Sequence, residues 1–148
     1  MRIFIDTNVA LDLISNRGEF GPDAESVFLI GYFGDADVWM SAKSFTDIFH
    51  ILRRSIAADQ AQEAIAALVR RVHVCSIEQE DIAAALEERW EDFEDCLIWQ
   101  AAKKVRADYI VTRDVNDFEQ SSISVVQPKE LLHYMEVEKG LIYEEIRF

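Results

Sequence analysis

Proline and glycine are scarce in this chain, with two prolines and five glycines among its 148 residues. Half of the residues are hydrophobic, so the composition excludes a disordered or low-complexity protein. No linker-like stretch and no internal repeat divides the sequence. A chain of this length is expected to form one domain with a sizeable core.

Cysteines and long apolar runs are few as well. The two cysteines, Cys75 and Cys96, lack metal-ligand spacing, and we expect buried free thiols rather than a disulfide. No apolar run reaches the length that spans a bilayer, which predicts no membrane association. The N-terminus has a single arginine and a short apolar strand in place of a signal peptide, so we expect a cytoplasmic location.

Basic residues are outnumbered, with 15 Lys and Arg against 28 Asp and Glu and a formal net charge of −13. Phosphate binding depends on basic residues and counterion release, so this excess argues against nucleic-acid binding through surface charge alone. Small basic clusters at 53–54, 70–71 and 103–106 are typical of helix ends. Bound metal would neutralise several acids, and the acidic excess also suits a basic protein partner.

Short apolar segments alternate with amphipathic ones along the chain. Strands are predicted at residues 2–6, 36–40, 72–75, 108–111 and 123–126. Helices are predicted at 8–15, 21–33, 43–56, 59–71, 77–89, 92–106 and 128–136, with N-terminal caps at Asp23, Asp59 and Ser76. This alternation predicts an α/β fold whose parallel sheet is covered on both faces. We expect residues 1–136 to form the domain and residues 137–148 to be a C-terminal extension packed on it, in which an added strand is one option.

Acidic residues recur at particular places in this pattern. Asp6 and Asp114 each follow an apolar strand, near the sheet edge where open α/β folds bind ligands. Asp47 lies beside the apolar stripe of its helix, and Asp92 and Asp95 occupy the first turns of theirs. The helix dipole accounts for Asp92 alone. Carboxylates have little reason to gather in a dry cleft unless a hard cation such as Mg²⁺ or Mn²⁺ neutralises them.

Three segments resemble the signature segments of PIN domains, and their order and spacing cover nearly the whole chain. They are FIDTNV at 4–9, DFEDCL at 92–97 and IVTRDVNDF at 110–118. The resemblance implies a three-layer α/β/α sandwich with a central, mainly parallel sheet of about five strands. It also implies a metal-dependent endoribonuclease of the VapC toxin type. An RNA substrate, an antitoxin protein and a second copy in a homodimer are the implied partners.

Carried over position by position, the resemblance also implies the site. The acids expected to act in catalysis are Asp6, Asp47, Asp95 and Asp114. Of these, Asp6, Asp95 and Asp114 are the expected ligands of Mg²⁺ or Mn²⁺. The residues expected to support them are Asn8, Thr112, Asp92, Asn116 and Asp117.

Two positions depart from the family pattern. The family's second acid is usually a glutamate, and the shorter Asp47 leaves a direct metal contact and a water-bridged one as alternatives. The last segment offers two acids, Asp114 and Asp117. We prefer Asp114, which is nearer the end of its strand, while Asp117 either touches the site or ties the turn.

The expected chemistry is hydrolysis of a phosphodiester. One or two divalent ions would lower the pKa of a bound water and brace the phosphate. We expect His50, His73 and His133 to be structural and no lysine to lie near the motifs, so the nucleophile must come from water that the metal activates.

Two other functions are open on the sequence alone. One is a PIN-like module that binds RNA or protein with weak or no catalysis, and the other is a flavodoxin-like receiver domain. The receiver lacks support, because the acid pair that it requires does not follow the first strand. Separately, the apolar run at 26–31 suits a dimer interface, a groove for a partner's helix, or a fully buried helix.

Overall fold

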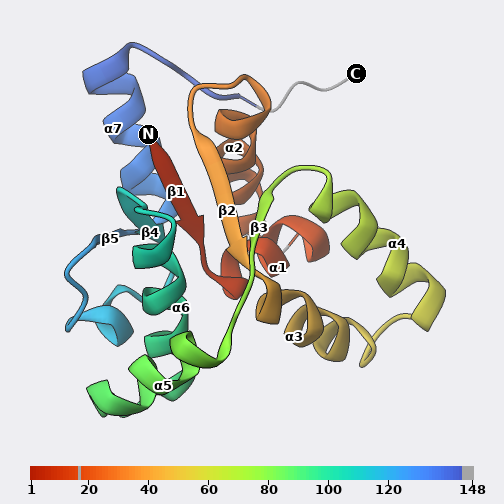
Figure 1. The fold of residues 1–148 in the computed structure, drawn as a ribbon. Helices are drawn as coiled ribbons and strands as arrows, with labels where there is room; N and C mark the ends of the chain where they lie inside the picture. The colour runs from red at the N-terminus through yellow and green to blue at the C-terminus, as the bar shows by residue number, and fades with distance from the viewer. Residues whose placement is uncertain (17, 145–148) are drawn as a thin grey trace.

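A parallel sheet forms the centre of the computed structural model, which describes residues 1–16 and 18–144 (Figure 1). In the described part of the chain the sheet has five strands in the order β3-β2-β1-β4-β5, and every neighbouring pair is parallel. The strands are β1 (Arg2–Ile5), β2 (Asp37–Ser41), β3 (His73–Cys75), β4 (Tyr109–Val111) and β5 (Ser124–Val126). This architecture confirms the predicted α/β/α fold.

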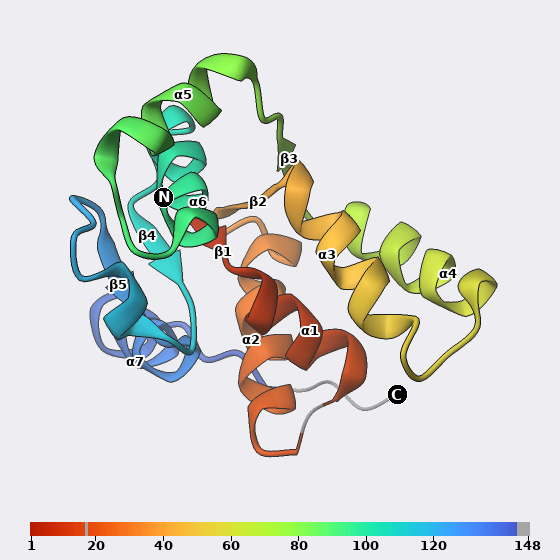
Figure 2. The same ribbon diagram turned by 90° about the horizontal axis from the view of Figure 1, so that it is seen from below.

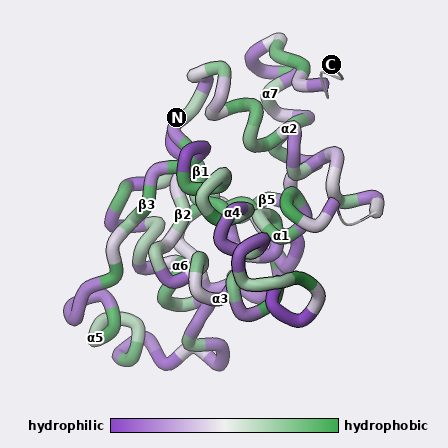
Figure 3. The backbone as a smooth tube through the Cα atoms, turned by 90° about the vertical axis from the view of Figure 1, so that its right-hand side faces the viewer, coloured by the Kyte–Doolittle hydropathy of each residue, from purple (hydrophilic) through white to green (hydrophobic). Residues whose placement is uncertain are grey.

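Helices connect the strands and cover both faces of the sheet. They are α1 (Thr7–Ser15), α2 (Phe20–Tyr32), α3 (Ala42–Leu52), α4 (Ala58–Val69), α5 (Gln79–Glu88), α6 (Phe93–Lys104) and α7 (Pro128–Lys139), with the 3-10 helix η1 (Val115–Phe118) after β4. Figure 3 shows hydrophilic and hydrophobic residues alternating along α4 on the outside of the molecule. Among the described residues, no helix is both long and apolar enough to cross a membrane.

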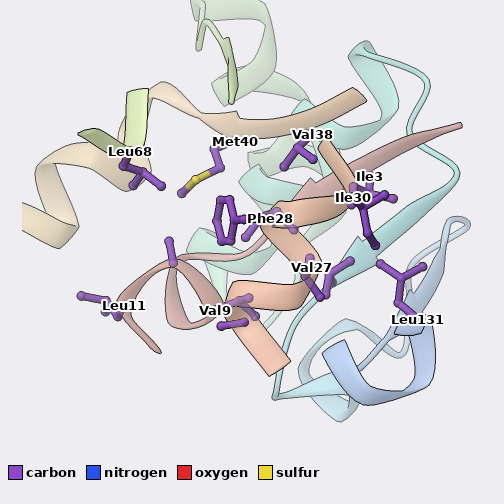
Figure 4. Close-up of a cluster of buried hydrophobic side chains, with 14 of the residues drawn as sticks. Ile3, Val9, Leu11, Val27, Phe28, Ile30, Val38, Met40, Leu68 and Leu131 are labelled. Carbon is purple, nitrogen blue, oxygen red and sulfur yellow. The ribbon is translucent and has the colours of Figure 1, made fainter. Parts of the chain in front are cut away.

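The central strand β1 separates two hydrophobic cores, because successive side chains of a strand point to opposite faces. Ile3 and Ile5 belong to the larger core, together with buried residues of α1, α2, α3, α4 and α7 (Figure 4). Phe4 belongs to the smaller core, which α5, α6 and η1 complete. All three side chains have no exposed surface, so β1 is held rigidly where it leads into the acidic residues.

The predicted caps of three helices are wrong, although the helices are present. α2 and α4 begin after Glu19 and Ala57, which places Asp23 and Asp59 inside the first turns, where the helix dipole also favours acids. The cap of α5 is Glu78 rather than Ser76. There the carboxylate of Asp81 accepts a hydrogen bond from the Glu78 backbone at 2.8 Å, so the chain stays extended past Ser76.

The C-terminal ends of two helices, α3 and α7, differ most from the prediction. α3 stops at Leu52 instead of residue 56, and α7 continues to Lys139, where Gly140 closes it in the left-handed conformation (φ 67°). No strand forms at 140–144, and residues 145–148 of the predicted extension lie outside the described residues. Leu141 and Tyr143 pack against the larger core, so the described part of the extension adheres to the domain. The two cysteines are free and buried, as predicted.

Helix α2 is buried through its middle and exposed at its C-terminal end. Val27, Phe28 and Ile30 have no exposed surface because α2 packs against α1, α7 and β2. Tyr32, at its last turn, is 77% exposed. Burial thus explains why the middle of the helix is apolar on more than one face.

We expect Phe28→Ala to lower the free energy of unfolding by about 3–5 kcal/mol, because it leaves a cavity in the larger core. Tyr32→Ala, on the same helix, should change it by less than about 0.5 kcal/mol. Urea unfolding followed by circular dichroism measures both values. Equal effects of the two substitutions would contradict the assigned packing of α2.

Candidate active site

Two adjacent parallel strands deliver the first two polar residues of the site. β1 and β4 pair in register, with Ile5 opposite Val111, so Asp6 and Thr112 leave the sheet at the same edge. The Asp6 backbone extends the ladder by donating to the Val111 carbonyl at 2.9 Å. Figure 2 looks onto this edge, where α1, α3 and α6 surround the end of β1.

Asp6 is the N-cap of α1 and a buried carboxylate, only 7% exposed. Its Oδ1 accepts from the Thr7 backbone N–H at 2.8 Å, and its Oδ2 accepts from the Thr112 hydroxyl at 2.8 Å. These bonds fix both oxygens and so set the direction in which the carboxylate faces the cleft.

The Thr112 hydroxyl joins Asp6 to the last acidic segment. It donates to Asp6 and accepts from the Asn8 amide at 3.2 Å and from the Asp114 backbone N–H at 3.1 Å. One donor and two acceptor sites are the full capacity of a hydroxyl. Asn8 also donates to Asp114 Oδ2 at 3.1 Å. The structure thus brings together Asp6, Asn8, Thr112 and Asp114.

Helix α6 brings the second acidic segment to the same place. Asp92 is its N-cap, and Asp92 Oδ1 accepts from the Asp95 backbone N–H at 3.1 Å. The pKa of Asp95 is raised to about 7, first by burial and then by the negative charges of Asp92, Asp6 and Asp117. Asp95 therefore lies close to Asp6, Asp92 and Asp117.

The pKa of Asp6 is raised to about 6 for the same reasons. Burial is the largest cause; the hydrogen bonds from Thr112 and Thr7 oppose it, and the charges of Asp114 and Asp117 add to it. Asp117 acts on both central acids and so lies close to the site, alongside Asp114. Asn116 lines a separate hollow, together with Asp92, Asp117 and Trp90.

A cavity of about 380 Å³ opens in front of these acids. Of the predicted residues, it is lined by Asp6, Asn8, Asp47 and Asp95. Asp114 instead lines a neighbouring cavity of about 580 Å³ with Arg113 and Lys129. Asp6 and Asp114 are thus joined by hydrogen bonds through Asn8 and Thr112, while their exposed sides face different cavities.

Lys43, Glu94 and His50 also line the first cavity, and the prediction of no lysine or histidine near the motifs is wrong in this respect. Lys43 Nζ donates to Asp47 Oδ2 and to Glu94 Oε1, each at 2.7 Å. The spacing of Lys43 and Asp47 by four residues on one helix is the signal that could have revealed the pair. No sequence pattern links them to Glu94.

Arg113 fixes the loop that carries Asp114. Its Nε lies 2.7 Å from Oδ2 of the buried Asp12, and its guanidinium stacks over the Phe20 ring, 4.4 Å from the centroid. Its backbone N–H donates to Asn8 Oδ1 at 3.4 Å. The loop is therefore tied to α1 and α2, a contact that sequence reasoning missed because the partners are 101 residues apart in the chain (113 − 12).

A divalent cation fits the donor set of this cleft. Within residues 1–16 and 18–144, no three acidic, histidine or cysteine side chains are grouped closely enough to hold an ion as they stand. The donors are nevertheless carboxylates, as hard cations prefer. The charges that raise the pKa values of Asp6 and Asp95 all come from other carboxylates. A cation would replace that repulsion with attraction, so Asp6, Asp95 and Asp114 would hold one once their side chains turn toward a common point.

The model of the PIN domain family matches residues 2–116 of the chain. No curated protein sequence matches it significantly. Among solved structures, VapBC2 of Rickettsia felis, bound to a promoter DNA fragment, matches with a TM-score of 0.68 and 15% identity, over 86% of this chain and 98% of that one. VapBC-1 of nontypeable Haemophilus influenzae matches with a TM-score of 0.65 and 22% identity, over 87% and 99%.

A third similar structure is that of VapC20 of Mycobacterium tuberculosis, a toxin that cleaves the sarcin–ricin loop. It matches with a TM-score of 0.58 and 19% identity, over 73% of this chain and 86% of that one. At these identities the similarity establishes the fold. Fold and cleft define a parallel α/β domain with an acidic site at the carboxyl edge of its sheet. The chain belongs to the PIN domain family, a family of nucleases.

The raised pKa values predict how stability depends on pH. Because folding raises the pKa of Asp95 from 3.8 to about 7, its stabilising contribution is complete below about pH 4 and lost as the pH rises through 7. In EDTA the melting temperature should therefore fall between pH 4 and pH 7.5, and less steeply in Asp95→Asn. Thermal unfolding by circular dichroism measures this. Asp59→Asn, on an exposed site, is the control and should keep the wild-type slope.

Thr112 is expected to position Asp6. Thr112→Val removes the hydroxyl from all three of its hydrogen bonds, raises the pKa of Asp6 further and should weaken Mn²⁺ binding about 10–100-fold. Calorimetric titration across pH measures the affinity and the midpoint of its pH dependence, which should move upward. Thr112→Ser retains the hydroxyl and should restore both. An unchanged midpoint in Thr112→Val would exclude this role.

Proposed function

We propose that the chain is a Mg²⁺- or Mn²⁺-dependent endoribonuclease that hydrolyses RNA phosphodiester bonds. The observation that carries the proposal is the pairing of Asp6 and Asp95, from the end of β1 and the start of α6, with pKa values raised to about 6 and 7 by burial and by neighbouring carboxylates. Such crowding is costly for a protein without a cation to bind. Metal-assisted phosphodiester hydrolysis is the chemistry that an oxygen-donor site in a nuclease family suits best.

Each residue has a distinct part in this proposal. Asp6, Asp95 and Asp114 would hold the cation, which would lower the pKa of a bound water and brace the phosphate. Asn8 and Thr112 fix the orientations of Asp6 and Asp114 through their hydrogen bonds. Asp92 caps α6 and so places Asp95, and Asp117 adds negative charge beside both. Asp47 lies on the opposite wall of the cavity, where it accepts a hydrogen bond from Lys43 and so contributes to the charge of the site.

The partners in this proposal are RNA, an antitoxin protein and a second copy of the chain, in the cytoplasm. The similar structures from Rickettsia felis and Haemophilus influenzae are VapBC toxin–antitoxin complexes, which supports an antitoxin partner. The net charge of −13 suits a basic partner segment. A short gene for a small DNA-binding protein, overlapping the start of this gene, would add support.

A second candidate function is a PIN-like module that binds RNA or protein with weak or no catalysis. It is favoured by the engagement of Asp47 with Lys43, which occupies one of the four predicted catalytic acids. A single assay distinguishes the two functions: the cleavage of tRNA, rRNA and mRNA is compared in the presence of Mn²⁺ and in the presence of EDTA. Absence of metal-dependent products from all three substrates would favour the binding module.

Asp6→Asn and Asp95→Asn should each abolish metal-dependent RNA cleavage, because each removes a charged ligand while keeping the side chain's size. Gel analysis of RNA products with Mn²⁺, Mg²⁺ or EDTA measures the effect. Asp59→Asn, which changes an exposed aspartate in α4, is the matched control and should cleave as the wild type does. Undiminished cleavage by either cleft variant would overturn the assignment of the site.

A further inference from the structure

The acidic cleft has two sides with different charge balance. On one side lie Asp6 and Asp95, and the charges acting on their pKa values are all negative. On the other side, the ammonium of Lys43 lies between Asp47 and Glu94, 2.7 Å from an oxygen of each. Both sides line the same cavity.

The local structure around Lys43 keeps its ammonium in the cleft. Strand β2 ends at Ser41, whose hydroxyl caps α3 by accepting from the Lys43 backbone N–H at 3.2 Å. This cap sets Lys43 in the first turn, one turn before Asp47 on the same face. Glu94 comes from the first turn of α6, on the opposite wall. The ammonium therefore links two helices across the cavity.

This arrangement leaves the α3 side already neutralised in part. Although burial alone would lower the pKa of Lys43, its hydrogen bonds to Asp47 and Glu94 raise the pKa above its ordinary value, so the side chain remains charged. A divalent ion bound to Asp47 would have to displace this ammonium or lie beside a like charge. The Asp6–Asp95 side has no such obstacle among the interactions that the structure describes.

We infer that Lys43 serves as the resident cation of the α3 side, occupying the position of a second divalent ion and limiting the cleft to one. The inference rests on the proposed function, because it requires that the cleft bind a divalent cation at all. An ammonium supplies positive charge and hydrogen-bond donors but does not act as a Lewis acid. The α3 side would then contribute charge to the site, while the Asp6–Asp95 side holds the ion.

The number of Mn²⁺ ions bound tightly per chain tests this inference. Electron paramagnetic resonance of free Mn²⁺ during titration of the full chain counts them directly. We expect one ion for the wild type and for Lys43→Arg, which keeps the charge. Lys43→Met should bind two, because it frees Asp47 and Glu94 as ligands. Lys43→Met combined with Asp47→Asn should return the count to one, and Asp47→Asn alone should leave it at one.

Lys104 provides a matched control outside the cleft. Its ammonium also pairs with two acids, lying 2.9 Å from Asp81 and 3.8 Å from Glu78. Lys104→Met therefore frees two carboxylates that lie outside the cleft of Asp6 and Asp95. The number of Mn²⁺ ions bound by this variant should stay at one. A gain in Lys104→Met equal to that in Lys43→Met would show that any freed acid pair binds Mn²⁺, which would overturn the inference.

The remaining outcomes separate the inference from the proposed function. Two ions in the wild type, or one ion in a Lys43→Met variant that circular dichroism shows to be folded, would overturn the role of Lys43 while leaving metal-dependent cleavage intact. If Lys43→Met does not fold, the number of Mn²⁺ ions bound by the wild type still tests the inference, because two bound ions would contradict it. No bound Mn²⁺ in the wild type would overturn the proposed metal dependence, and the inference with it.

Discussion

Repulsion between carboxylates in one cleft is the constraint on which the rest of the structure depends. Asp6 and Asp95 line one cavity, and burial is the largest cause of their raised pKa values of about 6 and 7. Neighbouring carboxylates raise both values further: Asp114 and Asp117 act on Asp6, and Asp92, Asp6 and Asp117 act on Asp95. The free energy that opposes this repulsion comes from elsewhere. Ile3, Phe4 and Ile5 are fully buried in two cores, and their burial fixes the end of β1. The acids are crowded because the sheet and α6 cannot move apart.

Helix N-termini offset part of this electrostatic cost. Asp6 caps α1 and Asp92 caps α6, so two helix dipoles direct their positive ends toward the acids. Thr112 adds a hydrogen bond to the charged form of Asp6. These contributions lower the pKa of Asp6, yet burial exceeds them. The helix dipoles and the Thr112 hydrogen bond thereby stabilise the crowded carboxylates without neutralising their negative charge. That charge remains to attract a cation.

Sequence reasoning predicted the strands, their parallel arrangement and the convergence of Asp6, Asn8, Thr112 and Asp114, because strand ends meet at one sheet edge whatever the details of packing. It failed where the outcome depends on contacts distant in the chain. The pairing of Arg113 with Asp12 and that of Lys43 with Glu94 require the relative placement of helices. The caps of α2, α4 and α5 were misplaced because the residues at these helix starts, Glu19, Ala57 and Glu78, make no side-chain cap hydrogen bond, so a search for capping side chains does not find the starts.

The aspartate at position 47 and the lysine at position 43 act together, as an ion pair on one face of α3. An aspartate on α3 reaches less far into the cavity than a glutamate would, and its nearest cation is the ammonium one turn earlier, at 2.7 Å. Glu94 then completes the pair from α6. Among the described residues, the ammonium of Lys43 thus partly balances Asp47 and Glu94, whereas the charges that act on Asp6 and Asp95 are all negative.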